Sequence, residues 1–313
     1  MDIDAVRNAH PDWLDHLESL GGLDLSFPRD LTAELLRLAV PHEDIAAVLA
    51  DVPGRGSRRW WLAERCVHSL VSTMGSLDRP PAFPSRLPDG FGPYFFVHVF
   101  LAALPYTREY HREHGVPDEV SWATLTDLGR NMAVHRRRHG TGGLHAPWWF
   151  TLHARGVLYD LGRLQFERTR LNGATGEGVA AAGAPAGPGD PALGVHVPEF
   201  KGPLTAAACD ASFERAREFF PRHFPEERHQ VATCHSWLLD DQLAAYLPGS
   251  NIVAFQRRFH LLQRLNAGAM LAFVFGADAE AAELPRRTAL ERAIGDHLAA
   301  GGTWYARAGW LRL

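Results

Sequence analysis

The feature that most constrains this chain is an alternation of strand and helix signals over residues 193–262. In chain order the segments are LGVHVP, the glycine-bearing loop EFKGPL, the helical TAAACDASFERAREFF, the strand-like HQVATCHSWLLD and SNIVAFQRRFHLL. A strand, helix and strand in succession predict neighbouring strands of one sheet with a helix packed against it. A helix that begins directly after a glycine loop offers backbone N–H groups to an anion. The unit therefore suits a phosphate-bearing ligand whose reactive end lies between two strands.

The composition is that of an ordinary soluble globular protein. The chain has 313 residues, 46% apolar and 22% charged, which is enough for two domains with a sizeable core. A net charge of −4 argues against a nucleic-acid partner, and no apolar run approaches the roughly 18 residues of a membrane span. The N-terminus lacks the layout of a secretion signal, and three cysteines without a CxxC pair fit reduced thiols. We therefore expect a cytoplasmic protein.

Two domains with different secondary-structure patterns are expected. Residues 1–143 carry apolar side chains at helical spacing and predict a helical domain. Residues 144–313 predict an α/β (α+β) domain, a mixed sheet flanked by helices. One or two strands are expected over WWFTLHARGVLYDLGRLQFERTRL, another at AMLAFVFG, and a helical pair over 241–263. Residues 172–192 are mostly Gly, Ala and Pro, which predicts a flexible surface loop between two strands.

The loop before the 205–220 helix has the features of an anion site. Thr205 is placed to cap the helix, and Lys201, Gly202 and Pro203 come immediately before it. Gly202 permits backbone conformations that let a ligand approach closely, and the helix dipole favours negative charge at this end. An ordinary strand-to-helix turn is the alternative, since a glycine before a helix is a weak signal.

Two strands carry polar residues where a central strand is normally apolar. In GVHVP, alternation turns Val195 and Val197 toward the core and His196 to the open face, where a histidine can accept a proton near neutral pH. In VATCHSWLLD, alternation places Cys234 with Ser236 and His235 with Trp237. A strand that departs from its local pattern is a candidate functional site. Structural hydrogen bonding of these residues is the alternative.

The combination of segments resembles a known family. The pieces YDLGRLQFE, HVPEFKGPLT, SFERAREFF with its HFPEE exit, CHSWLLD and SNIVAFQRRF are similar to the GNAT-like C-terminal domain of bacterial acyltransferases that also carry a helical N-acyltransferase N-terminal domain. They run in the family's order over roughly residues 145–313, and residues 1–143 resemble the partner domain more weakly. The long insertion at 172–190 departs from the pattern.

The resemblance implies how the donor is held. In GNAT folds the fourth and fifth strands splay and the pantetheine arm of acyl-CoA lies between them, with its pyrophosphate on the loop that follows the fourth strand. By position GVHVP is that strand, QVATCHSWLL the fifth, and EFKGPLT the pyrophosphate loop. Because this loop lacks the usual glycine-rich signature, acyl-CoA and an acyl carrier protein both stand as donors. The donor-binding candidates are Val197, Lys201, Gly202, Pro203, Leu204, Thr205, Trp237 and Asn251.

The implied chemistry is direct attack of a small-molecule amine on the thioester carbonyl in a ternary complex. His196 is the expected base, with Glu199 as a second candidate, and Ser236 or Tyr246 is expected to reprotonate the thiolate. His235 completes the catalytic candidates. A covalent route through Cys234 is a weaker alternative, because adjacent strand residues face opposite sides and His235 would not reach the thiol.

Three further interpretations remain open. The histidine pairs of HREH and HRRRH, which are His111, His114, His135 and His139, are close enough to suggest metal ligands, but three arginines adjoin the second pair and we expect no metal. Arg130 and Arg136–Arg138 form a basic cluster that could meet an acidic carrier or a CoA phosphate. A GNAT-like fold can also serve as a catalytically inactive acyl-CoA-binding or scaffolding module. We expect neither a nucleic-acid nor a membrane partner.

Overall fold

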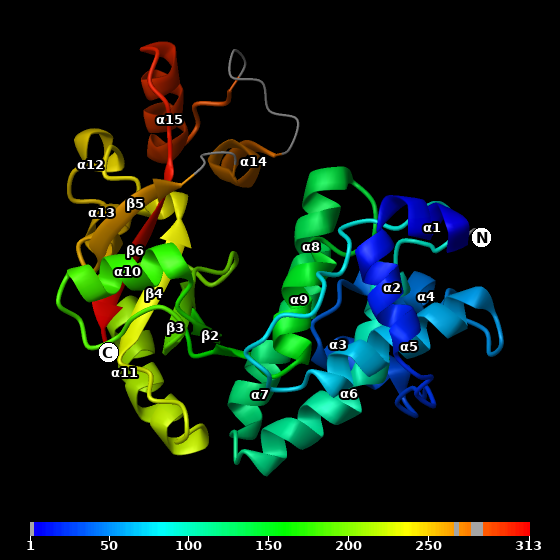
Figure 1. Cartoon of the computed structure of the whole chain (residues 1–313). Coiled ribbons are helices and arrows are strands. Elements are labelled where there is room, and N and C mark those ends of the chain that lie inside the picture. The colour runs from blue at the N-terminus through cyan, green and yellow to red at the C-terminus, as the bar shows by residue number, and fades with distance from the viewer. Residues whose placement is uncertain (1–2, 266–268, 277–283) are drawn as a thin grey trace. The chain divides into compact units, whose positions relative to one another are not determined.

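The chain forms two compact units, Met1–Asp160 and Leu161–Leu313. The structure is a computed structural model that describes residues 3–265, 269–276 and 284–313 (Figure 1). The division lies later than the expected boundary at 143/144. The reason is that a helix and a short strand follow residue 143 within the first unit.

The first unit is helical, as the periodicity predicts. Its elements are α1 (Ile3–Ala9), α2 (Pro11–Ser19), α3 (Leu31–Arg37), α4 (His42–Ala50), α5 (Arg58–Ser72), α6 (Phe95–Glu113), α7 (Asp118–Leu125), α8 (Asp127–His139), α9 (Pro147–Ala154) and β1 (Leu158–Asp160). Phe83, from the proline-rich loop, packs on Phe96 and Phe100 of the long helix α6 and closes the core. Among the described helices, none is both long and apolar enough to cross a membrane.

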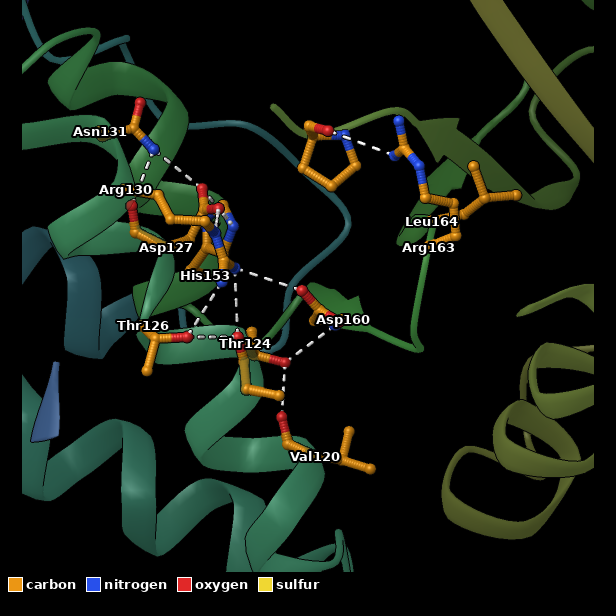
Figure 2. Close-up of polar contacts among 12 residues, drawn as sticks. Val120, Thr124, Thr126, Asp127, Arg130, Asn131, His153, Asp160, Arg163 and Leu164 are labelled. Atoms are coloured by element: carbon orange, nitrogen blue, oxygen red, sulfur yellow. Dashed lines mark hydrogen bonds and ion pairs between the residues drawn. The ribbon is translucent and has the colours of Figure 1, made fainter. Parts of the chain in front are cut away.

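A buried charged network joins α8, α9 and β1 in this unit (Figure 2). Asp127 is 3% exposed and accepts hydrogen bonds from Arg130 Nε at 2.8 Å and from Trp149 Nε1 at 3.2 Å. His153 Nε2 lies 3.2 Å from the same carboxylate, and Arg130 also reaches Asp160 Oδ2 at 3.2 Å. Burial acts to raise the pKa of Asp127, but His153 and Arg130 outweigh it and hold that pKa well below its usual range.

The second unit is a mixed sheet with helices on both faces. Within this unit the described strands form one sheet in the order β2-β3-β4-β6-β5. They are β2 (Gln165–Arg170), β3 (Pro191–His196), β4 (Val231–Ser236), β5 (His260–Leu265) and β6 (Ala306–Arg312). Its helices are α10 (Gly173–Ala181), α11 (Ala206–His223), the 3₁₀ turn η1 (Trp237–Leu239), α12 (Leu243–Tyr246), α13 (Asn251–Gln256), α14 (Ala269–Phe275) and α15 (Ala289–Ala299). The expected fold class is confirmed.

Strands β3 and β4 run parallel, and α11 connects them, whereas the pairs β2–β3, β4–β6 and β5–β6 are antiparallel. The phenylalanine of β2, Phe166, packs on Phe213 and Phe220 of α11, which places α11 against one face of the sheet. Helix α10 lies against the other face, where Val179 joins an apolar cluster with Val231 of β4. Figure 1 shows α10 crossing the strands. The strand–helix–strand unit predicted over residues 193–262 is present.

Residues 172–192 are not the flexible loop that their composition predicts. Asn172 accepts a hydrogen bond from Thr175 N and caps α10, which contains three glycines. Two of these glycines lie inside the helix, and each costs about 1 kcal/mol relative to alanine, so the segment has a weak intrinsic preference for helix. Burial of Val179, which is 0% exposed, stabilises the helix against the sheet.

Three further predictions of secondary structure are wrong. The aromatic run after Pro147 forms α9, because proline at the first helical position favours a helix start. The apolar run AMLAFVF forms α14, since a short continuous apolar segment does not distinguish strand from helix. The expected helical pair over 241–263 ends at Gln256, and the polar segment His260–Leu265 that follows pairs with β6 as strand β5.

Candidate active site

The parallel ladder between β3 and β4 is short. It pairs Leu193 with Ala232 and Gly194 with Thr233, and it ends there within the described strands. His196 and His235 lie two residues beyond the last pair, at the C-terminal end of each strand. The two strands are neighbours in the sheet, so they lead from a paired region into a region where no ladder joins them.

His196 forms a pair with a carboxylate that was not anticipated. The antiparallel register of β2 and β3 sets Gln165 opposite His196 and Glu167 opposite Gly194. Glu167 Oε2 lies 2.9 Å from His196 Nε2 across this diagonal. Glu167 is 4% exposed, while 30% of the His196 side chain is exposed. A carboxylate at this distance accepts Nε2–H, and in the neutral ring the lone pair then lies on Nδ1.

Gly194 makes room for this pair. A Cβ atom at Gly194 would lie 3.3 Å from His196 Nε2 and 3.4 Å from Glu167 Cβ. Distances of this size are tighter than ordinary van der Waals contact, so a larger residue would push the imidazole or the carboxylate out of place. Neither Gly194 nor Glu167 was singled out from the sequence, because their roles depend on the register between β2 and β3. In QFERT the polar residues Gln165, Glu167 and Thr169 alternate and share one face of the strand, and this polar face is the signal that could have indicated Glu167.

The end of β4 departs from a regular strand. His235 is exposed, and Ser236 turns the chain because its Oγ accepts a hydrogen bond from Leu238 N at 3.1 Å. Trp237 then begins the turn η1 and is 8% exposed in an apolar cluster. The strand predicted over QVATCHSWLL therefore extends three residues too far, since Trp237–Leu239 form η1, and Trp237 does not share a strand face with His235.

The loop between β3 and α11 has the expected geometry. Gly202 has φ +76° with open space where a side chain would stand, and it is exposed like Pro203. Thr205 Oγ1 accepts a hydrogen bond from Ala208 N at 3.2 Å and caps α11, as predicted. Leu204 is buried, whereas Glu199 and Lys201 are half-buried. Val197 packs against the apolar cluster that contains Trp237. Because Gly202 has a left-handed backbone conformation and no side chain, the backbone is exposed directly before the positive end of a long helix.

Two of the candidate residues, Tyr246 and Asn251, lie on helices after β4. The Tyr246 hydroxyl lies 3.1 Å from His297 Nδ1 of α15, and its ring packs near Trp304. Asn251 is the exposed first residue of α13, beyond the cap Ser250. No hydrogen bond among the described residues joins Tyr246 or Asn251 to His196.

The cysteines are buried, which weakens the covalent alternative. Cys66, Cys209 and Cys234 are all free and buried, and burial raises the pKa of the Cys234 thiol to about 12. A thiol with so high a pKa is almost entirely protonated near neutral pH and is a poor nucleophile.

We expect the folded protein to resist alkylation. Iodoacetamide at pH 7.5 should leave the intact mass unchanged over a time in which a small free thiol reacts completely, because all three thiols are buried. The same protein in guanidinium chloride should gain three carbamidomethyl groups, which serves as the control for reagent activity. Rapid labelling of Cys234 in the folded protein would show a reactive thiol and would support the covalent route.

The histidine and arginine clusters of the first unit are occupied by structural contacts. His111 is buried and its Nδ1 lies 2.6 Å from Ser121 Oγ, and burial together with Arg108 lowers the pKa of His111 to about 3. In the basic cluster, Arg130 binds Asp127, and Arg136 pairs with the buried Asp44. Two of the four arginines of the cluster thus already pair with carboxylates of the same unit, and a landing patch for an acidic partner stays a prediction. The described residues contain no group of three or more His, Cys, Asp or Glu side chains arranged to hold a metal.

Comparison with known proteins defines the family. The N-acyltransferase N-terminal domain matches residues 29–156, and the GNAT-like C-terminal domain matches residues 158–311. Similar solved structures are an acyltransferase in complex with decanoyl-CoA and teicoplanin, one with decanoyl-CoA, and one with CoA and 10C-teicoplanin. Each is 40% identical to this chain, with 100% of both chains covered and a TM-score of 0.88. A comparison with curated proteins found no match.

These matches identify the class of protein that the sheet and its interrupted ladder define, a GNAT-like acyltransferase. The chain belongs to the acyltransferase family that joins an N-acyltransferase N-terminal domain to a GNAT-like C-terminal domain. The resemblance noted from the sequence is thereby confirmed.

Proposed function

We propose that the enzyme transfers an acyl group from acyl-CoA to an amine of a small molecule by direct attack in a ternary complex. The observation that carries this proposal is the end of the β3–β4 ladder at Gly194 and Thr233, with the His196–Glu167 pair beside it. In this arrangement backbone groups of the parting strands can hold the thioester arm and its carbonyl oxygen. The position of a proton acceptor next to that arm supports acyl transfer to an amine.

In the proposed reaction His196 Nδ1 takes the proton that the attacking ammonium must lose. The amine nitrogen forms the new C–N bond, the C–S bond of the thioester breaks, and CoA leaves as a thiolate that takes up a proton. Glu167 holds the imidazole in one orientation, as a carboxylate does for other catalytic histidines. Glu199 stays as the second candidate for the base. Ser236, at the end of β4, is our first candidate for the proton donor, because its oxygen accepts from Leu238 N and its O–H remains able to donate.

The donor is assigned from the relatives and from the loop before α11. The solved relatives carry acyl-CoA, so we propose acyl-CoA as the donor here, with no metal. Its pyrophosphate is placed at Lys201 and Gly202 and at the backbone before α11, where the helix dipole is positive. An acyl carrier protein would present the same pantetheine arm, and comparison of the two donors at equal concentration decides between them.

The acceptor is proposed from the complexes of the relatives. Two of them hold teicoplanin or 10C-teicoplanin, and we therefore propose a glycopeptide of the teicoplanin type that carries a free amine as the acceptor of this enzyme. Such a molecule is a small-molecule acceptor in the sense expected from the sequence.

The test is an acyl-transfer assay with decanoyl-CoA and an amine-bearing teicoplanin-type glycopeptide. We expect one decanoyl group to appear on the glycopeptide by mass spectrometry, with an equal amount of free CoA thiol. Isothermal titration calorimetry with decanoyl-CoA measures the affinity of the enzyme for the donor. Binding of decanoyl-CoA without transfer to this or any other amine would favour the inactive binding module, and failure to bind acyl-CoA would overturn the donor assignment.

A further inference from the structure

Arg163, in the bend before β2, is a half-buried cation that pairs with no carboxylate of the described residues. Its Nη1 donates a hydrogen bond to Pro198 O at 3.2 Å (Figure 2). Its Nε is enclosed and has no acceptor within the described part of the chain. One neutral carbonyl oxygen is therefore the only hydrogen-bond partner of this guanidinium group within residues 3–265, 269–276 and 284–313.

The surroundings leave the charge of Arg163 uncompensated. Burial lowers the pKa of Arg163, because removal from water disfavours the charged form. The group stays charged near neutral pH all the same, since the pKa of an arginine lies above about 12. A half-buried cation of this kind is stabilised by an anion that accepts hydrogen bonds from its remaining N–H groups. Arg163 is thus suited to bind an anionic group of a ligand.

The bend that carries Arg163 is joined to the loop and the helix that follow β3. Ser212 Oγ of α11 accepts hydrogen bonds from Arg163 N at 2.9 Å and from Leu164 N at 3.2 Å. Pro198, whose carbonyl oxygen binds the guanidinium group, lies in the loop between β3 and α11, four residues before Gly202. The side chain therefore lies beside the loop to which the pyrophosphate of the donor is assigned.

A second arginine near the start of α11 differs from Arg163 in its partners. Burial raises the pKa of Cys209, and the positive charges of Arg258 and Arg163 act against this shift, so both guanidinium groups lie near that end of the helix. Arg258 forms an ion pair with Asp210, and its Nη2 donates a hydrogen bond to Ala206 O at 3.0 Å. Of the two, Arg163 is the one whose charge no carboxylate of the described residues neutralises.

We propose that Arg163 binds the pyrophosphate of the acyl-CoA donor. The inference rests on the proposed function, which places that pyrophosphate at the loop before α11, and Arg163 contacts the same loop at Pro198. A guanidinium group offers several N–H donors in a fixed plane, which suits the oxygens of a phosphate. The bend before β2 thus supplies a positive charge to a loop, EFKGPLT, that lacks a glycine-rich signature of its own.

The experiment measures the binding of three donors to Arg163→Gln by isothermal titration calorimetry. Decanoyl-CoA carries the pyrophosphate and the 3′-phosphate, decanoyl-dephospho-CoA lacks only the 3′-phosphate, and S-decanoyl-pantetheine has no phosphate. We expect Arg163→Gln to raise Kd for the first two by roughly 10–100-fold, the effect of losing hydrogen bonds to a charged group. Kd for S-decanoyl-pantetheine should stay within twofold. The matched control is Arg217→Gln, an exposed arginine further along α11, which should change no Kd by more than twofold.

Arg163→Lys keeps the inference testable if thermal unfolding shows that Arg163→Gln does not fold. Lysine keeps the charge without the planar group, so Kd for the two pyrophosphate-bearing donors should rise by roughly 3–10-fold. Equal losses with all three donors would show a structural role, and a loss confined to decanoyl-CoA would assign Arg163 to the 3′-phosphate. Either result overturns the inference, as does unchanged binding of every donor. If the parent enzyme binds none of the three donors, the donor assignment of the proposed function fails instead, so the two failures are distinguishable.

Discussion

Replacing His196 with alanine should lower kcat/KM for acyl transfer by roughly 10²–10⁴-fold, the usual contribution of a general base. The reason is that we propose this ring, which pairs with Glu167 at the end of the β3–β4 ladder, as the group that accepts the proton of the amine. The shape of the pH–rate profile should also change in the variant, because the proposed general base has been removed. The measurement is steady-state release of CoA thiol between pH 5.5 and 9.

Two variants separate the loss of the base from a disturbance of the strand. His196→Gln places an amide N–H near Glu167 but supplies no basic nitrogen, so it should be about as inactive as the alanine variant. Glu167→Gln leaves the base in place without its carboxylate and should show a smaller loss. The matched control is His139→Ala, an exposed histidine at the end of α8, which should keep full activity.

An activity of His196→Gln within threefold of the parent enzyme would contradict the assignment of the base. In that case Glu199 becomes the next residue to test, since it lies in the loop directly after β3, which ends at His196, and is half-buried. A large loss in His196→Gln with an unchanged pH–rate profile would indicate that the residue binds substrate rather than accepting the proton. Calorimetry with decanoyl-CoA on the same variant decides between these outcomes.

Local signals predicted the elements that position the candidate site. A serine or threonine before an apolar-periodic run marks a helix start, and Thr205 caps α11 as expected. Glycine before a helix predicted a special backbone conformation, and Gly202 has φ +76°. Alternation predicted that His196 faces away from the buried Val195, and 30% of its side chain is exposed. Each of these features depends on residues within a few positions of one another.

Features that depend on distant residues were not predictable in this way. Glu167 becomes the partner of His196 only through the register between β2 and β3, which aligns residues 29 positions apart in the chain. Thr175 meets His235 because α10 folds back over the sheet, and the glycine-rich composition of that segment favoured a loop. Packing of Val179 and the absence of a Cβ at Gly176 outweigh local preference there.

The second large effect concerns stability. Asp127→Ala should destabilise the first unit by about 3–5 kcal/mol, because it removes one partner of a buried ion pair and leaves Arg130 without its nearest carboxylate. For a unit of this size that corresponds to a fall in Tm of roughly 6–20 °C, measured by circular dichroism. The matched control is Asp89→Ala, because the Asp89 side chain is fully exposed and its removal should change stability by less than about 0.5 kcal/mol.

The pH dependence of Tm should show the stabilising charge of the same carboxylate when the parent enzyme is compared with Asp127→Asn. The folded state holds the pKa of Asp127 below its usual range, so its charge stabilises the native state above the unfolded pKa of about 3.9, and that contribution is lost as the pH falls below it. Burial acts to raise the pKa of Glu227, but His229 and Arg168 bind it and lower that pKa to about 2. The stabilisation that the charge of Glu227 gives the folded state is therefore also lost in acid, and equally in the parent enzyme and in Asp127→Asn. The difference in Tm between the parent enzyme and Asp127→Asn therefore isolates Asp127. We expect that difference to be largest near pH 6 and to shrink toward pH 3, and a constant difference over this range would show that Asp127 contributes by packing and not by its charge.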